Sequence, residues 1–388
     1  MILVGCGGGG SSSTAASTSS VATLYPGTFD YTSIDPTAPA NYTAPTLPAH
    51  YDSVLLATSN QTASNPLTDK GATLGRVLFN DKRLSFNDSK SCASCHVQIN
   101  GFVDTAQFSS GFAGGLTTAH AMRLGNVAFY PGATMFWDKR AASVEVQATI
   151  PIQNATEMGF DSTHGGFAAL ITKMQALPYY PELFNWAFGD SAITEVRAQN
   201  ALAQYERAII SSSSKWDRAY AVVYAANGSV NSNQNFARSL AGTNIPVADR
   251  FTASEDNGRA LFVKGSINGG KGCGSCHQPP TFALSANSKS NGLDAGETTI
   301  FKSPSLKNVG LAGRFMHDGR FSTLAQVLAH YATGIRAGAA LDNRLPAGGL
   351  ATTIGLTSTE QADIVAFLGT LTDSTLLTDA RFTDPFKK

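Results

Sequence analysis

Two short stretches of the chain hold the residue types that bind a haem covalently. Each has two cysteines separated by two residues and followed at once by a histidine: Cys92, Cys95 and His96 in the first, and Cys273, Cys276 and His277 in the second. This pattern is the attachment signature of a c-type haem, whose vinyl groups bond to the thiols and whose iron binds the histidine. Such a motif could also be a redox dithiol or half of a zinc site. Because a four-cysteine zinc site draws its pairs from a short stretch, the wide separation favours two covalently bound haem c groups.

A second repeated pattern precedes each haem motif. Gly-Arg-x-Leu-Phe occurs at residues 75–79 and again at residues 258–262, at nearly the same distance from the cysteines that follow. Similar segments in the same order indicate a duplicated module. We therefore expect two cytochrome c-like haem domains with one haem in each.

Helices are expected to position these motifs, because apolar residues recur at helical spacing in several segments. The expected helices cover residues 67–79, 164–177, 194–212, 252–262 and 323–333, and a last helix starts at 357. Residues 252–255 and 357–360 have the pattern of a capping box, which marks a helix start. Strand signals are sparse, so the predicted fold class is mainly α.

The length of 388 residues is enough for two domains with substantial cores. Residues 7–48 are rich in small and polar residues, which predicts a tether and an extended arm. Residues 227–248 are polar and rich in Gly and Asn, which is typical of an interdomain linker. These observations predict a leader and arm over residues 1–48, a first haem domain over 49–240 and a second over 241–388.

The fifth cysteine, Cys6, ends a run that resembles a bacterial lipobox, where the new N-terminal cysteine acquires a lipid. The segment before Cys6 lacks the basic start of a signal peptide. Covalent haem attachment independently implies export in bacteria. We therefore expect a protein of the periplasm or cell surface, tethered through a lipid at Cys6. The formal net charge of +0 and the absence of a basic patch exclude nucleic acid as an expected partner.

The order of motifs resembles that of the bacterial di-haem cytochrome c peroxidase superfamily, which includes the MauG enzymes. The motifs are G-R-x-L-F, C-x-x-C-H, F-W-D-x-R, P-I-x-x-x-x-E-M-G, a second C-x-x-C-H, P-S-L-x-N-V and M-H-D-G-R-F-x-T-L. The similarity covers about residues 67–370. It implies an oxidoreductase that reacts with hydrogen peroxide at its N-terminal haem and draws electrons through its C-terminal haem.

The resemblance also implies roles around the first haem. His96 is the expected proximal ligand, and Glu157, twenty residues after Trp137, takes the place of the family's acid–base glutamate. Gln147 and Pro151 take the places of distal-pocket residues, and Trp137 that of the residue that conducts electrons between the haems. A lone Glu is usually solvated and a lone Trp usually belongs to the core. Their joint spacing favours the catalytic interpretation.

At the second haem the sixth ligand decides the chemistry. Many peroxidases of the family have a Met fourteen residues after the histidine of the H-x-G motif, whereas here that residue is Tyr331, as in the MauG branch. A phenolate is a hard anionic donor that stabilises oxidised iron, while Met raises the potential. Met316, His317 and His330 are rival ligands by residue type, and Tyr331 could instead be a core aromatic residue of the 323–333 helix.

The remaining histidines are less informative. His120 lies near the position of a loop histidine that ligates the first haem in resting peroxidases, but it aligns better with an asparagine near the family's calcium. It could therefore support a ligand, belong to a metal region or act as a gate. The resemblance allows one calcium ion between the domains. His50 and His164 are expected to be ordinary surface histidines.

Three functions are compatible with these residues. The expected one is a peroxidase whose electron donor is a small cytochrome c or a cupredoxin. The first alternative is a MauG-type enzyme that oxidises aromatic residues of a partner protein, which Tyr331 favours. The second is a non-catalytic di-haem electron carrier, which would need two strong axial ligands at the first haem. Gln147 and Glu157 in place of a Met or His favour an open iron position instead.

Overall fold

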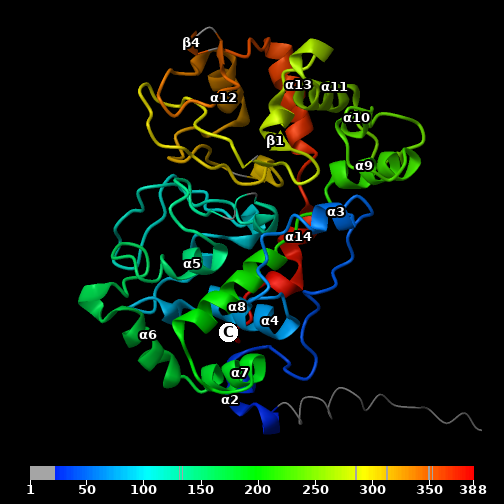
Figure 1. Ribbon diagram of the computed structural model, residues 1–388. Coiled ribbons are helices and arrows are strands. Elements are labelled where there is room, and N and C mark those ends of the chain that lie inside the picture. Colours follow the sequence, from blue (N-terminus) through cyan, green and yellow to red (C-terminus); the bar gives the residue numbers. More distant parts are fainter. Residues whose placement is uncertain are drawn as a thin grey trace, which may run out of the picture.

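Figure 1 shows the computed structural model of the chain, which describes residues 22–388 except 131, 133, 285, 312, 348, 349 and 352. Cys6 and its lipobox-like run lie outside these residues. The helices are α2 (Pro26–Tyr31), α3 (Ser53–Leu56), α4 (Asp69–Asn80), α5 (Val144–Thr149), α6 (Gly166–Gln175), α7 (Tyr179–Phe188), α8 (Glu195–Ala208), α9 (Lys215–Ala226), α10 (Asn233–Phe236), α11 (Ala253–Val263), α12 (Leu324–Ala329), α13 (Ser358–Gly369) and α14 (Ser374–Thr378).

Strands form only two short antiparallel pairs in the described residues: β1 (His277–Gln278) with β2 (Ala283–Leu284), and β3 (Pro346–Ala347) with β4 (Leu350–Ala351). The prediction of a mainly α fold is therefore confirmed. None of the described helices is long and apolar enough to cross a membrane.

The same pair of packed helices occurs in each half of the chain, with α4 against α8 and α11 against α13. The glycine of the Gly-Arg-x-Leu-Phe pattern lies at each contact. A Cβ on Gly75 would stand 2.0 Å from the carbonyl oxygen of Ala201, and one on Gly258 would stand 1.9 Å from that of Asp363. Because any larger residue would force the helices apart, the repeated pattern encodes a close contact just before each haem motif.

The buried apolar side chains form two main clusters. The first combines α4, α6, α7 and α8, and the second combines α9, α11 and α13. The chain passes from the first cluster to the second between Ile209 and Trp216, and Figure 1 shows α9 and α10 in the same body as α11. Phe236 and Ile245 are buried in the second cluster, so the expectation of a linker over residues 227–248 is wrong. The domain limits at 49, 240 and 241 stay a prediction.

Both ends of the described chain pack on the first cluster. Leu376 of α14 and Phe382 are buried there, although they follow the last helix of the second cluster. The hydroxyl of Tyr42 donates to the carbonyl of Arg381 at 2.6 Å. Part of the expected extended arm is therefore packed against the returning C-terminal segment (Figure 1).

Two asparagines hold the junction between the clusters. Asn126 and Asn308 both have left-handed backbone, with φ of 62° and 63°. The side-chain oxygen of Asn126 accepts from the N–H of Ser211 at 2.9 Å, and that of Asn308 accepts from the N–H of Asp373 at 2.7 Å. The Ser211 hydroxyl donates to the Asp373 carboxylate at 3.2 Å. The segments that follow α8 and α13 are thus bound to each other.

His50 is fully buried, so its prediction as a surface histidine is wrong. Its Nε2 lies 3.2 Å from Oδ1 of Asp217, which also accepts from Nζ of Lys307 at 2.6 Å, and the three side chains have no exposed surface. Burial lowers the pKa of His50 by more than the Asp217 carboxylate raises it. Burial raises the pKa of Asp217, but Lys307 and His50 together lower it further. The result is a buried ion pair between Asp217 and Lys307 that also binds His50, and it joins the segment just after the expected arm to α9 and to the segment around Lys307.

Candidate haem sites

The first haem motif lines a small cavity of about 60 Å³. The cavity brings together predicted residues from three parts of the chain: Cys92, Cys95, His96, Gln147, Pro151 and Glu157. Cys92 lies in a 3-10 turn over Cys92–Ser94, and Cys95 and His96 follow this turn directly. Gln147 lies on α5, and Pro151 and Glu157 lie in the segment after α5. All the predicted residues of the first site except Trp137 therefore meet at one cavity.

His96 is held ready for ligation. Its Nδ1 lies 3.3 Å from the carbonyl oxygen of Phe102, so this nitrogen donates and Nε2 keeps its lone pair. Burial lowers the pKa of His96 to about 4, which keeps the ring neutral. Cys92 and Cys95 form no disulfide, and burial raises the pKa of both thiols.

Glu157 is the titratable residue that the sequence predicted for proton transfer. Its backbone N–H donates to the side-chain oxygen of Asn154 at 3.1 Å, which fixes the turn that carries it. The side chain is half-buried. Burial raises the pKa of its carboxyl, and Arg140 opposes this only in part. A carboxyl with a raised pKa at a cavity holds a proton more readily than an ordinary carboxyl, as a group that takes and returns a proton requires.

A second carboxyl at this cavity was missed in the sequence. Glu206 of α8 lines the same cavity, is 5% exposed, and has its pKa raised to about 8 by burial, with Arg207 opposing. The signal was its position four residues after Leu202, on the apolar face of an expected helix. The first cavity therefore contains two carboxyl groups.

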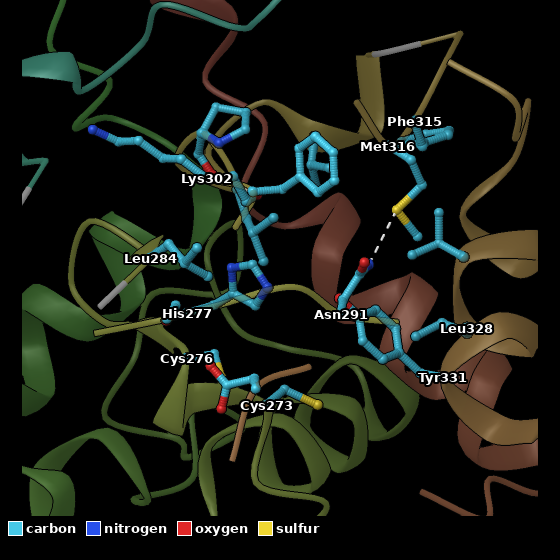
Figure 2. Close-up of a pocket in the computed structure, with 18 of the residues that line it drawn as sticks. Cys273, Cys276, His277, Leu284, Asn291, Lys302, Phe315, Met316, Leu328 and Tyr331 are labelled. Carbon is cyan, nitrogen blue, oxygen red and sulfur yellow. Dashed lines mark hydrogen bonds between the residues drawn. The ribbon is translucent and has the colours of Figure 1, made fainter. Parts of the chain in front are cut away.

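The second haem motif lines a larger cavity of about 480 Å³. Cys273 and Cys276 are free thiols, and burial lowers the pKa of His277 to about 4, which keeps its ring neutral. Figure 2 shows His277 on one side of this space and Met316 and Tyr331 on the other. The predicted ligand Tyr331 therefore faces the histidine across the cavity, and one of its rivals lies beside it.

The contacts of His330 and His317 distinguish these two candidate ligands from Tyr331 and Met316. Nε2 of His330 lies 3.1 Å from the carbonyl oxygen of Asn291, and His330 is not among the residues that line the cavity. His317 lines it, but its ring stacks on Phe301 at 3.8 Å between ring centroids. The side-chain amide of Asn291 lies 3.4 Å from the sulfur of Met316 and 3.3 Å from the hydroxyl of Tyr331.

Trp137 and His120 lie on the border of the second cavity. The indole N–H of Trp137 donates to the carbonyl of His120 at 2.8 Å, and the N–H of His120 donates to the carbonyl of His317 at 2.9 Å. Nδ1 of His120 lies 3.1 Å from the carbonyl oxygen of Ala106. His120 is not among the residues that line the first cavity, which argues against its role as a gate there.

The duplication explains how the two sites differ. Trp137, Ser143 and Pro151 precede His317, Thr323 and Tyr331 by the same number of residues in each case. Ser143 caps α5 as Thr323 caps α12, which agrees with an equivalence of the two segments. Pro151 therefore takes the position of Tyr331 in the first module. Since proline has no side-chain donor atom, this position cannot supply a ligand there.

The residues present fit two haem c groups, because each cavity combines two free thiols with a neutral histidine. In addition, Nδ1 of His277 is buried and has no partner within the described part of the chain. The same part of the chain contains no group of three or more His, Cys, Asp or Glu residues that could hold a metal ion. The calcium ion keeps only the support of the resemblance.

Comparisons with known proteins agree with this arrangement. A family model described as "Di-haem cytochrome c peroxidase" matches residues 69–223 and 253–339. The chain is 30% identical over 325 residues to "Methylamine utilization protein MauG" of Methylorubrum extorquens, covering 79% of this chain and 80% of that one. It is 29% identical over 274 residues to "Cytochrome c551 peroxidase" of Nitrosomonas europaea, covering 66% and 71%.

Among solved structures, a MauG-like protein associated with microbial copper homeostasis is similar to the chain, with a TM-score of 0.64 and 26% identity. The similarity covers 89% of this chain and 99% of that one. The correspondence thus extends over both cavities.

Proposed function

The chain belongs to the di-haem cytochrome c peroxidase family of peroxide-dependent oxidoreductases, and on this premise we propose that its two haem sites have different tasks. Hydrogen peroxide reacts at the His96 site, and electrons reach it through the His277 site. The observation that supports this division is that Pro151 and Tyr331, which take equivalent positions in the two modules, differ in their ability to bind iron. Pro151 offers no donor atom at its position in the first site, whereas Tyr331, at the equivalent position, and Met316 offer donor atoms to the second.

The haem at His96, when bound, supplies an iron that can take up a peroxide oxygen and deliver the electrons that cleave the O–O bond. The chain's own residues move the proton. The Glu157 carboxylate accepts it from one peroxide oxygen and returns it to the other, which leaves as water. The Gln147 amide on α5 orients the peroxide from the same cavity, and Pro151 keeps the approach free of a competing ligand.

Trp137 connects the two sites in this proposal. The indole lines the second cavity and is fixed by the carbonyl of His120, whose own N–H is bound to the H-x-G segment at His317. Tyr331 and His277 would hold the iron of the second haem, and as a phenolate Tyr331 would stabilise the oxidised metal. Trp137 would carry electrons between the two sites.

The proposal extends to the organisation of the chain. We assign one cytochrome c-like haem domain to residues 49–240 and one to residues 241–388, each built mainly on one core cluster. The chain passes from the first cluster to the second already between Ile209 and Trp216. The periplasm is the proposed compartment, with a lipid at Cys6 as the tether. The proposed electron donor is a small cytochrome c or a cupredoxin, in keeping with the relatives named as peroxidases.

A MauG-type role, in which aromatic residues of a partner protein supply the electrons, is the second candidate. The observations that favour it are Tyr331 in place of the peroxidases' Met and the 30% identity to a protein named MauG. An electron carrier is the third, and the absence of a donor atom at Pro151 argues against it.

The test is stopped-flow mixing of the holoprotein with hydrogen peroxide, for the native chain and for Glu157→Gln. Removal of a positioned acid–base group lowers a rate by about 10²–10⁴-fold, so we expect a loss of this size with both haem spectra retained. Glu195→Gln is the matched control, because Glu195 of α8 lines neither cavity. An unchanged rate in Glu157→Gln would remove Glu157 from the mechanism. Two low-spin haems that ignore peroxide would support the carrier.

A second assay distinguishes the peroxidase from the MauG-type enzyme. Reduced cytochrome c or a reduced cupredoxin is offered to the peroxide-treated holoprotein, and N-acetyltryptophan amide is offered in parallel. Fast repeated turnover with the small metalloprotein alone supports the peroxidase. Reduction by the indole alone supports the MauG-type enzyme.

A further inference from the structure

Two buried cations line the second cavity without a carboxylate partner. Arg123 is 6% exposed and Lys302 is 4% exposed, and both border the space beside His277. Lys271 pairs with Glu360 and Arg344 pairs with Asp342, while Lys289 and Arg314, which also line the cavity, are only half-buried. None of the ion pairs found between described residues includes Arg123 or Lys302. The site therefore buries two basic side chains that its own carboxylates do not pair, and burial lowers the pKa of Lys302 to about 7, so an anion beside it would stabilise its charged form.

The contacts of these cations are neutral groups. Nζ of Lys302 donates to the carbonyl of Thr134 and lies 4.0 Å from the centre of the Tyr130 ring. Nε of Arg123 is buried and has no hydrogen-bond partner within the described residues. The nearby cation Lys139 adds repulsion to Lys302. An unpaired buried charge is strongly unfavourable, so these groups favour an anion in the cavity.

We propose that Arg123 and Lys302 bind the propionate carboxylates of the haem at His277, an inference that rests on the proposed function. A haem c carries its thioether bonds on one edge and its two propionates on the opposite edge. Figure 2 shows Lys302 and the two cysteines on opposite sides of His277, as this orientation requires. Two carboxylates match two cations, and a guanidinium binds a carboxylate with two parallel hydrogen bonds.

Lys302 also connects this edge to the conducting tryptophan. Its backbone N–H donates to the carbonyl of Trp137 at 2.6 Å, while its Nζ holds the carbonyl of Thr134 in the same segment. A propionate bound to Lys302 would therefore be connected, through Lys302 itself, to the segment that carries Trp137. Lys302 acts as a positioning residue, since it binds the haem edge and orients Trp137 without touching peroxide.

The test uses the holoprotein and two readouts of the second haem: the propionate bending bands in its resonance Raman spectrum and its reduction potential as a function of pH. In Lys302→Gln we expect the bands to shift and the potential to fall, because an unneutralised carboxylate stabilises ferric iron. Lys302→Arg should restore both. Lys264→Gln is the matched control, because Lys264 directly follows α11 in the second half of the chain and lines neither cavity.

The outcomes separate this inference from the proposed function. Unchanged bands and potential in a haem-loaded Lys302→Gln, while the native chain still reacts with peroxide, would overturn only the propionate assignment. Inorganic phosphate is added in a parallel series, and bands that move with phosphate in the native chain would show that a free anion fills the site instead. If Lys302→Gln fails to load haem, Arg123→Gln is measured in the same way and decides the question. A native chain that ignores peroxide contradicts the proposed function and leaves the Raman result standing.

Discussion

The amide of Asn291 is within hydrogen-bond reach of two candidate ligand atoms, the sulfur of Met316 and the hydroxyl of Tyr331. Burial raises the pKa of Tyr331 to about 12, and the hydrogen bond from Asn291 opposes this shift. A phenol buried in this way is a poor acid in the protein alone, and the positive iron would have to favour its ionised form. Whether the hard oxygen of Tyr331 or the soft sulfur of Met316 binds the iron thus depends on the few atoms around the Asn291 amide.

Tyr331→Phe should therefore change the ligand of the second haem rather than prevent haem binding. With the phenol removed, Met316 is the nearest donor atom, and we expect a low-spin haem of higher potential. Electron paramagnetic resonance and a redox titration measure both changes. The control is the double variant Tyr331→Phe, Met316→Leu, which should give a high-spin haem. A low-spin signal that the single substitution leaves unaltered would contradict ligation by Tyr331.

Pro151→Met tests the equivalence of the two modules from the opposite side. Pro151 has the position of Tyr331 and lines the first cavity, so a thioether placed there should ligate the first haem. We expect the high-spin signal to disappear and the peroxide reaction to slow by at least about 10²-fold. Pro151→Ala, which adds no donor atom, should keep the high-spin signal. A Met variant that stays high-spin would mean that the two positions are not equivalent in space.

His50 predicts how stability depends on pH. Its pKa in the folded chain is lowered by burial, so the unfolded chain takes up a proton first as the pH falls through about 6.5. Stability should therefore fall below this pH, by at most about 1.4 kcal/mol per pH unit for this group. Denaturant unfolding at pH 7.5 and 5.5 measures the loss, and His50→Gln should make the loss smaller. An equal loss in native and variant chains would exclude His50 as a cause.

At the scale of elements, the contact between α4 and α8 depends on Gly75. A methyl group there would overlap the carbonyl oxygen of Ala201, so Gly75→Ala should cost about 1–3 kcal/mol of unfolding free energy or more. The variant should also weaken haem attachment at Cys92, since α4 leads into that motif. Gly369→Ala at the end of α13 is the control, because nothing lies within 4 Å of an added Cβ. It should be neutral or stabilise by up to about 1 kcal/mol.

The helices that the sequence predicted best are those with a cap and a clear apolar face. α4, α8, α11 and α13 all begin after a capping threonine, α13 begins at the expected start, and α4, α8 and α11 end within a few residues of the expected limits. The 323–333 helix is confirmed as α12, followed by a π-helical turn at His330–Gly334. Each of these signals is local, which is why the sequence could reveal it.

α9 was missed for a reason that the structure makes clear. The last helix expected before 252 ended at residue 212, among the serines at 211–214, but Ser214 and Asp217 form a capping box that starts a further helix. Trp216, Tyr220 and Tyr224 then recur every four residues and bury against the second cluster. The residues of the first haem site were predicted because motif spacing is visible in the chain. Glu206 and Lys302 were not, because burial of a charge depends on partners far away in sequence.

At the scale of the whole molecule, Asp373 ties the two cores together. Its carboxylate accepts from the Ser211 hydroxyl and from the N–H groups of Ser212 and Ser213, each of the latter at 2.9 Å. Asp373→Ala leaves these buried donors unpaired, at about 1–3 kcal/mol each. We expect lower stability and, in calorimetry, two separate transitions where the native chain has one. Asp190→Ala, at an exposed pair with Arg197, should leave a single transition. Two transitions in the native chain would contradict the coupling.

The return of the C-terminal segment sets an order in which the molecule can be finished. A chain made from its N-terminus emerges from the ribosome with the first haem motif long before Leu376 and Phe382, yet these two residues belong to the core behind that motif. The second core has all its parts once Leu371 has been made. Limited proteolysis of nascent chains should accordingly find the second core protected before the first. The site encoded first would be the last to close, at the ribosome and equally when the chain crosses the membrane in the proposed export, so Cys92 would stay accessible to haem attachment for longer than Cys273.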